Sequence, residues 1–358
     1  MKIGLFYNSL IHPSGGARML LIYAKLLSEL GYRPIILTGS VSSRIFNVFK
    51  ELKNYDIIVL GRYFQEINLL KEIRKWNIEY LFLFSKYYLA KLIKYLNTDV
   101  RVFLYIFFPY SYVYSFSLDE IKKRVGLKRR ILRGLEHYLY NNADRILTIS
   151  RFSQKIINNI GLKSVVLYEP IDTDFFKPDW KKKRYNLIIS VSQFTPGKMF
   201  HKMILLFKKL QGEYELVLAG GINPAFLKYI IYLKKIARDD KRIKFIFNPD
   251  DNQLRELYQR ATVYWHLREE HHILTPLEAM ACGTPSVLTA KGGIDGAIHE
   301  FNSFLARNED EFIRYSEILL QNRNLWYKMA SNAVISVKRF SLSNIKKDLN
   351  KVLLSLSK

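Results

Sequence analysis

The sequence is poor in several features that would define its class. Its 358 residues include a single cysteine, Cys282, which excludes a disulfide framework and favours a reducing compartment. No run of about 18 uninterrupted apolar residues occurs, so no transmembrane helix is expected. The N-terminal apolar run is broken by Pro13 and two glycines and lacks the cleavage site of a signal peptide. These absences predict a cytoplasmic protein.

Acidic residues are also scarce, with 32 Asp and Glu against 56 Lys and Arg, which gives a net charge of +24. A basic surface attracts nucleic acid, anionic membrane and phosphorylated substrates, and the charge alone does not choose between them. Hydrophobic residues make up 49% of the chain, which is enough for ordinary globular cores. Because single cores stop growing near roughly 250–300 residues, the length predicts two domains.

Short β-branched runs alternate with amphipathic stretches along the chain, and the pattern restarts after a charged connector at 177–184. Buried strands are expected at 3–7, 34–38, 56–60, 80–84, 102–107 and 145–150, and further strands at 187–191, 215–219, 243–247, 263–266 and 286–289. Helices are expected at 17–30, 65–75, 127–141, 202–210, 224–238, 252–260 and 276–282. Strands that alternate with helices favour parallel sheets covered on both faces.

This organisation predicts an α/β protein with two doubly wound, Rossmann-like domains, at residues 1–172 and 173–340. The C-terminal helix, at about 341–358, is expected to pack back on the first domain. Ligands of such sheets bind beyond the carboxyl ends of the strands. If the two domains face each other, the cleft between them is the expected site.

The segment 270–285, EHHILTPLEAMACGTP, combines a helix start with two glutamates. Thr275 suits the N-cap, Pro276 the first helical position and Glu278 the third, so Glu278 has a purely structural reading as a capping-box residue. In the functional reading, the free amides and positive dipole end of this helix hold a diphosphate. The Glu278 carboxylate would then accept hydrogen bonds from a ribose. Gly283 is expected to end the helix.

Glu270 and Glu278, followed by Ala-Met-Ala-Cys-Gly-Thr-Pro, resemble the donor signature of retaining GT-B glycosyltransferases. This large family includes sucrose synthase and phosphatidylinositol mannosyltransferase. Other segments resemble the family in the same order: the last strand of its first domain at 143–150, its interdomain stretch at 167–178, its diphosphate-lysine loop at 192–198, and its late glycine loop at Gly292–Gly293 with 302–305. The resemblance spans nearly the whole chain and is strongest in the second half.

The resemblance implies a GT-B hexosyltransferase that moves a sugar from a nucleotide-diphosphate sugar with retention of configuration, without cofactor or metal. It assigns the catalytic roles to Glu270, at the donor sugar, and to Lys198, at the departing diphosphate. The implied donor-binding residues are Gly15, Gly16, Lys198, Glu270, Ile273, Leu274, Thr275, Glu278, Gly292 and Gly293. Gly15 and Gly16 also have a plain reading as a tight turn between a strand and a helix.

The sequence departs from the family pattern at the leaving group. The family usually has an arginine about five residues before the diphosphate lysine, and this chain has Gln193 there. Arg18, Lys202 and Arg268 are candidates to supply the missing positive charge. Losing one well-placed donor of this kind costs about 3–4 kcal/mol in other enzymes.

Two further departures concern the sugar and the reaction centre. The family's Glu-x-Phe-Gly becomes Glu270-His-His-Ile273, and its Tyr-x-His-x-Pro stretch becomes Tyr105-Ile-Phe-Phe-Pro109, with Phe107 in place of the histidine. Three histidines are candidates to compensate from the other side of the cleft: His266, His271 and His272. Asp172-Thr-Asp174 has the form of a metal-binding Asp-x-Asp, but it lies at the domain connector, so no metal is expected.

A basic amphipathic stretch at 122–133, KKRVGLKRRILR, follows an aromatic-rich segment at 103–116. Basic helices beside aromatic residues suit an anionic membrane surface, and a solvated helix face beside a buried strand is an equal alternative. The first reading predicts a peripheral membrane protein with a glycan, glycolipid or lipid-linked acceptor.

Two other classes compete with a transferase. The charge of +24 favours a protein that binds or glycosylates nucleic acid, but no helix-turn-helix, RNP or zinc motif supports that class. Gln193 and Phe107 favour a GT-B protein that binds donor without transferring it.

Overall fold

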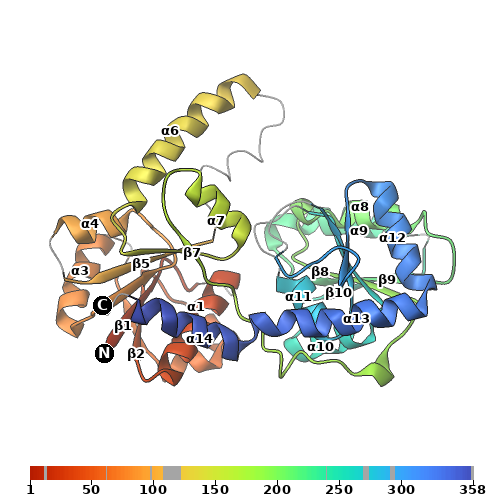
Figure 1. Ribbon diagram of the computed structural model, residues 1–358, viewed down its shortest axis with the longest axis horizontal. Helices are drawn as coiled ribbons and strands as arrows, with labels where there is room; N and C mark the ends of the chain where they lie inside the picture. Colours follow the sequence, from red (N-terminus) through yellow and green to blue (C-terminus); the bar gives the residue numbers. More distant parts are fainter. Residues whose placement is uncertain are drawn as a thin grey trace. The chain divides into compact units, whose positions relative to one another are not determined.

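The computed structural model describes residues 1–11, 14–61, 63–96, 99–107, 122–238, 240–268, 274–290 and 295–355, with backbone only at 122–130. The chain divides into two compact units (Figure 1). The first unit is Met1–Pro170 with Ile345–Lys358, and the second unit is Ile171–Asn344. The sequence-based boundary, between 172 and 173, falls next to this division.

The first unit is built on a seven-stranded parallel sheet with the strand order β3-β2-β1-β4-β5-β6-β7. The strands are β1 Lys2–Tyr7, β2 Arg33–Thr38, β3 Asp56–Val59, β4 Tyr80–Leu83, β5 Arg101–Ile106, β6 Arg145–Thr148 and β7 Val165–Val166. The helices are α1 Gly15–Glu29, α2 Ser43–Val48, α3 Gln65–Trp76, α4 Leu89–Tyr95, α6 Lys122–Tyr140, α7 Arg151–Asn158 and the short η1 Lys50–Asn54. The central strands are continuous apolar runs because helices cover both faces of the sheet.

The C-terminal helix α14, Leu342–Leu354, is amphipathic and packs on the first unit from Ile345 onwards. Its buried side consists of Ile345, Leu349, Val352 and Leu353. On its exposed side, Nζ of Lys346 lies 2.8 Å from Oε2 of Glu29 at the end of α1. A 3–4 spacing of apolar residues therefore explains why the last helix attaches to this unit.

The second unit repeats the topology with a six-stranded parallel sheet in the order β10-β9-β8-β11-β12-β13. The strands are β8 Leu187–Val191, β9 Glu215–Gly220, β10 Ile243–Phe247, β11 Val263–His266, β12 Ser286–Thr289 and β13 Ser303–Ala306. The helices are α8 Phe200–Phe207, α9 Leu227–Ala237, α10 Asp251–Arg260, α11 Leu274–Ala281, α12 Glu309–Gln321 and α13 Arg323–Val337. Short turns are η2 Trp180–Lys182, η3 Pro196–Lys198, η4 Pro224–Phe226 and η5 Lys338–Phe340.

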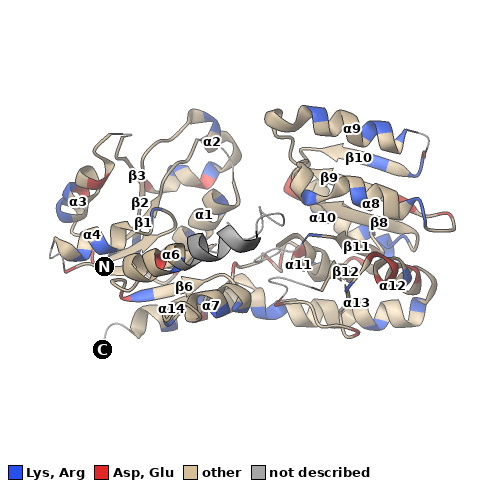
Figure 2. Cartoon of the chain, turned by 90° about the horizontal axis from the view of Figure 1, so that it is seen from above, with Lys and Arg blue, Asp and Glu red and all other residues tan. Residues whose placement is uncertain are grey.

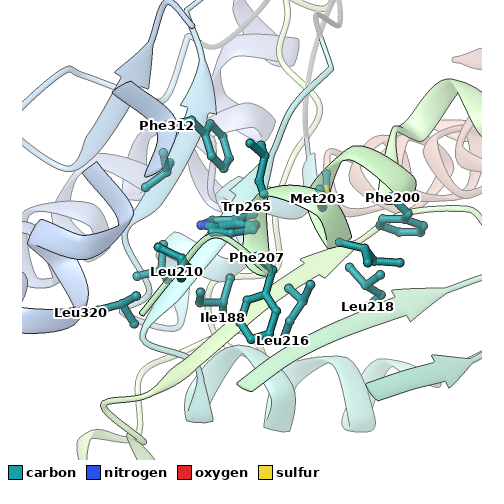
Figure 3. Close-up of a cluster of buried hydrophobic side chains, with 14 of the residues drawn as sticks. Ile188, Phe200, Met203, Phe207, Leu210, Leu216, Leu218, Trp265, Phe312 and Leu320 are labelled. Atoms are coloured by element: carbon teal, nitrogen blue, oxygen red, sulfur yellow. The ribbon is translucent and has the colours of Figure 1, made fainter. Parts of the chain in front are cut away.

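The core of the second unit is centred on Trp265 of β11 (Figure 3). Its ring lies 6.5 Å from the ring of Phe207 on α8 and 5.1 Å from that of Phe312 on α12, measured between centroids. The indole Nε1 donates to Oγ of Ser316 at 2.9 Å, so the one polar atom of this fully buried side chain is satisfied. Helices α8 and α12 are thereby fixed to β11.

The predicted fold class is confirmed, since both units are α/β with a parallel sheet, and every predicted strand is present. One strand is not buried as predicted: β3 is only partly buried because it lies at a sheet edge. Seven elements were not predicted from the sequence: β7, β13, α2, α4, α7, α12 and α13. No helix within the described residues is long and apolar enough to cross a membrane.

Candidate active site

The strand order of the second unit reverses between β8 and β11, which places the loops that follow these two strands next to each other. In open parallel sheets, this topological switch point at the carboxyl ends is where ligands bind. The loop after β8 carries Lys198, and the chain after β11 carries Arg268 and leads to α11. The candidate site is therefore built at this edge.

The loop that carries Lys198 is held rigidly. The buried ring of Phe194 packs 4.9 Å from the rings of both Phe200 and Phe247, and its amide donates to the Gly221 carbonyl at 2.9 Å. The Lys198 amide closes the η3 turn by donating to the Thr195 carbonyl at 3.0 Å. A fixed backbone gives the lysine a defined position at the end of β8.

Arg268 lies against the same loop from the β11 side. A methyl group added to Gly197 would lie 3.2 Å from Nη1 of Arg268. Arg268 and the loop that carries Lys198 are thus adjacent at the switch point. Lysine and arginine provide the charge and the donors that a diphosphate requires.

Gly220 and Gly221, at the end of β9, were missed by the sequence analysis. Gly220 has φ +150°, and a Cβ there would lie 1.6 Å from the carbonyl oxygen of Ser192, so only glycine fits. The ends of β8 and β9 therefore approach each other through backbone atoms alone. The signal that could have revealed them is Ala-Gly-Gly at the end of a predicted strand, because such glycines allow close backbone approach.

The helix start in the 270–285 segment differs from the predicted one. α11 begins at Leu274, so Thr275 is the second helical residue and not the N-cap. Its Oγ1 lies 2.7 Å from the hydroxyl of Tyr264, which also donates to the Val191 carbonyl at 2.9 Å. Tyr264 thereby joins the start of α11 to the end of β8. The prediction erred because Thr275 bonds to a distant tyrosine and not to its own helix.

Glu278, the fifth residue of α11, is held by a side chain of α10. It is 8% exposed, and its Oε2 accepts a hydrogen bond of 3.1 Å from the hydroxyl of Tyr258 on α10. Burial, with the Glu278 charge as a smaller cause, raises the pKa of Tyr258 well above its usual value, so the phenol stays protonated. The predicted capping-box reading is therefore wrong. Tyr258 fixes the carboxylate near the start of α11.

Helix α11 ends just before Gly283, as predicted. The helix ends at Ala281, and Gly283 has φ +73°, where a Cβ would lie 2.8 Å from the ring of Trp180. Beneath this end, Nζ of the buried Lys183 donates to the carbonyls of Tyr258 and Ala261 and to Oγ1 of Thr284, at 3.0, 3.1 and 2.6 Å. Burial lowers the pKa of Lys183 to about 7.

The remaining predicted residues of the second unit are dispersed. Gln193 is exposed, Nζ of Lys202 lies 3.5 Å from Oε1 of Glu309 on α12, and His266 is buried at the end of β11 with 3% exposure. Arg268 is therefore the candidate for the missing charge that contacts the Lys198 loop. Six predicted residues lie outside the described part of the chain: Glu270, His271, His272, Ile273, Gly292 and Gly293.

In the first unit, Gly15 and Gly16 open α1, and Arg18 lies in its first turn. Ser14 caps the helix through its Oγ, which accepts from the Ala17 amide at 3.2 Å. A Cβ on Gly16 would lie 2.5 Å from the hydroxyl of Tyr7, whereas Gly15 faces open space. The plain reading as a tight turn thus accounts for Gly16 without a ligand.

The Asp-x-Asp stretch at 172–174 forms a local turn. Oδ1 of Asp172 accepts from the amides of Asp174 and Phe175 at 3.2 and 2.9 Å. Among the described residues, no group of three or more His, Cys, Asp or Glu is arranged to hold a metal. The carboxylate of Asp172 therefore has a structural role that explains the motif.

Comparison with known proteins bears directly on the second unit. Residues 171–334 match the family model of glycosyl transferases group 1, and this span fills nearly all of Ile171–Asn344. The second unit therefore resembles glycosyl transferases group 1. The switch-point residues described above lie within the span that resembles this family.

Several proteins resemble the chain. It is 27% identical over 205 residues to GDP-Man:Man(3)GlcNAc(2)-PP-Dol alpha-1,2-mannosyltransferase of Dictyostelium discoideum, covering 51% of this chain and 41% of that protein. It is 25% identical over 178 residues to N-acetyl-alpha-D-glucosaminyl L-malate synthase of Bacillus anthracis, covering 49% and 45%. The chain thus spans less than half the length of these two curated relatives.

Solved structures resemble the chain over both units. Anabaena Alr3699/HepE in complex with UDP has a TM-score of 0.82 at 17% identity, covering 99% of this chain and 100% of that one. Sucrose-phosphate synthase from Thermosynechococcus elongatus has a TM-score of 0.79 at 15% identity, covering 99% and 98%. At such identities the likeness concerns the fold, and both units of the chain have the GT-B arrangement of strands.

Proposed function

We propose that the protein is a glycosyltransferase that moves a sugar from a nucleotide-diphosphate sugar to an acceptor, with retention of anomeric configuration. The observation that carries the proposal is the closeness of Arg268 to the loop that carries Lys198, at the switch point of a unit that resembles glycosyl transferases group 1. Transfer breaks the bond between the anomeric carbon and the diphosphate oxygen. Negative charge then develops on the leaving phosphate, where two fixed cations stabilise it.

The remaining roles follow from the helix α11. In this proposal the amides of Leu274 and Thr275 bind the phosphates, and Glu278, oriented by Tyr258, accepts from the ribose hydroxyls. Glu270 holds the hydroxyls of the donor sugar. Cations of the chain itself supply the electrostatic stabilisation, so no metal or cofactor is required. Arg268 takes the place of the arginine that Gln193 replaces, because it contacts the lysine loop.

For the acceptor we propose a lipid-linked glycan or glycolipid at an anionic membrane surface. The support is α6, which projects from the first unit (Figure 1) and exposes Ile131, Leu135 and Tyr138 at 61, 49 and 56%. These residues follow one another at spacings of four and three, so they form one stripe. The relative from Dictyostelium is named for a dolichol-linked substrate, whereas the one from Bacillus anthracis is named for malate.

The test begins with donors. Thermal unfolding is measured with UDP-, GDP- and ADP-sugars, since a ligand at about 100 times its dissociation constant stabilises by about 2.7 kcal/mol. We expect one nucleotide class to stabilise the second unit, and release of that nucleoside diphosphate on adding acceptor. NMR of the product then gives the anomeric configuration. No stabilisation by any nucleotide sugar contradicts the proposal.

Two outcomes would favour other functions. Stabilisation by a donor without release of nucleoside diphosphate indicates a donor-binding protein, which the departures at Gln193 and Phe107 favour. Phe107 packs 6.3 and 5.3 Å from the rings of Phe84 and Tyr105, so it occupies an aromatic cluster and not a polar position. A salt-sensitive gel shift without donor binding indicates a nucleic-acid partner, which the charge of +24 favours.

A further inference from the structure

Helix α9, Leu227–Ala237, covers the outer edge of the second unit. It connects β9 to β10, and β10 is the last strand at that end of the sheet. Its inner side buries Ile230, Leu233 and Ala237, and Nδ1 of His201 on α8 lies 2.9 Å from the hydroxyl of its Tyr229. The helix is thus firmly attached on one side, and its other side faces outward.

The outward side of α9 is unusually apolar. Leu227, Ile231 and Tyr232 are 51, 68 and 45% exposed, and Phe226 in the preceding turn η4 is 36% exposed. Leu227 and Ile231 are four residues apart, so they lie one above the other on the same face. Exposed large side chains are ordinary when scattered singly, but four within seven residues form a patch.

Basic side chains surround this patch. Lys228, Lys234, Lys235 and Arg238 are all exposed, and Figure 2 shows basic residues along α9 at the edge of its unit. The segment 224–238 contains no acidic residue. Asp239 and Asp240 follow it in the sequence, and the carboxylate of Asp240 is engaged by the guanidinium of Arg242 at 2.7 Å. The outward side of α9 is therefore both cationic and apolar.

A surface that is both cationic and apolar fits some anionic partners better than others. A nucleic acid would be bound by cations and aromatic rings, and it offers no apolar phase for Leu227 and Ile231. An anionic bilayer attracts the basic residues and accepts aliphatic side chains at the boundary between headgroups and acyl chains. The central position of the aliphatic pair between cations favours the bilayer.

We propose that α9 and η4 form a membrane-contacting surface that docks the second unit on anionic lipids. This surface is separate from the α6 stripe of the first unit, and it does not depend on sugar transfer. The side chains of Leu227 and Ile231 enter the headgroup boundary, while the four cations pair with lipid phosphates.

A single-site probe tests this contact directly. The only native cysteine, Cys282, is buried and burial raises its pKa to about 12, so it does not compete for labelling. Ile231→Cys is labelled with a polarity-sensitive fluorophore in the full-length protein. The matched control is Ile335→Cys on α13, because Ile335 is similarly exposed, at 63% against 68%, in the same unit.

With vesicles of phosphatidylcholine and phosphatidylglycerol at physiological salt, emission at position 231 should shift to the blue and increase. Emission at position 335 should stay unchanged, and vesicles of pure phosphatidylcholine should have little effect on either. If the protein floats with anionic vesicles but the probe at 231 does not respond, the proposal is wrong and binding occurs elsewhere. Binding to single-stranded RNA with no response to vesicles would also overturn it.

The charge dependence provides a second measurement. Lys235→Gln should weaken vesicle binding about fivefold, since each basic residue near an anionic surface contributes about 1 kcal/mol. Lys328→Gln, at an exposed lysine of α13, carries the same charge change and should have little effect. Both variants alter solvent-exposed residues, so both should fold. Equal weakening by the two would show that net charge and not α9 binds the vesicles.

Discussion

The two units share one topology but differ in the chemistry of their switch points. In both, the first strand lies inside the sheet and the order reverses beside it, between β1 and β4 and between β8 and β11. The second unit presents Lys198, Arg268 and the bare backbone of Gly220 there. The first unit presents Tyr7 over Gly16 and a cluster of rings that includes Phe84, with Tyr105 5.1 Å away.

This difference shows that a shared fold does not determine which groups stand at its switch point. A parallel sheet provides an edge at which loops meet, and the residues of those loops decide what the edge can hold. Cations in the second unit suit a diphosphate, whereas the rings of Phe84 and Tyr105 in the first unit are buried and pack on each other. The group 1 family model matches residues 171–334, which lie in the unit with the cationic edge.

We expect the largest loss of activity from replacing either of two cations at the switch point of the second unit, Lys198 or Arg268. Lys198→Ala and Arg268→Ala should each lower kcat about 10²- to 10³-fold, because each removes a donor aimed at the leaving diphosphate. The double variant should fall short of the product of the two losses, since both act on one leaving group. Release of nucleoside diphosphate is the measurement.

Each unit provides one control variant for this prediction. Lys202→Ala removes a cation of the second unit that pairs with Glu309, and Arg18→Ala removes one from the first turn of α1. Both should keep kcat close to that of the unaltered enzyme. A loss with Arg18→Ala as large as that with Arg268→Ala would break the contrast between the units.

Most of the fold followed from the sequence because apolar periodicity reports local structure directly. β1 and β8 are apolar runs between breaks, and α14 has its apolar residues at helical spacing. The short strand β7 was missed because it has two residues, too few for any periodicity.

The site was predicted less completely, since its members are brought together by tertiary contacts. Lys198 and Glu278 stand within motifs, but Tyr258 and Tyr264 act through hydroxyls that meet residues distant in the sequence. The same holds for Arg268, whose closeness to Gly197 follows from the pairing of β8 with β11. The N-cap prediction at Thr275 failed for this reason, because a local rule cannot foresee a distant partner.

A smaller effect concerns the way in which the stability of the second unit depends on pH. The pKa of Lys183 is lowered by burial to about 7 from 10.5, so between these values the unfolded chain binds a proton that the folded chain releases. The free energy of unfolding of the second unit should therefore rise with pH by up to about 1.4 kcal/mol per unit in this window. Chemical denaturation at several pH values measures this slope.

Lys183→Met isolates that contribution, because it removes the titrating group and keeps an unbranched side chain. The slope between neutral and alkaline pH should become flatter for the second unit, while that of the first unit stays the same. A variant with an unchanged slope would show that Lys183 remains charged in the folded protein. Its three oxygen acceptors would then outweigh its burial.

The smallest effect tests whether packing against Tyr7, and not a bound ligand, requires glycine at position 16. Gly16→Ala should destabilise the first unit by about 1 kcal/mol, because the new methyl group meets the Tyr7 hydroxyl and the ring must shift. Gly15→Ala is the matched control, since nothing lies within 4 Å of a Cβ at that position. Thermal unfolding checks both variants, and the double variant Gly16→Ala with Tyr7→Phe should recover part of the loss. If Gly15→Ala weakened donor binding while leaving stability intact, the open space at Gly15 would belong to a ligand, and the aromatic edge of the first unit would be part of the donor site.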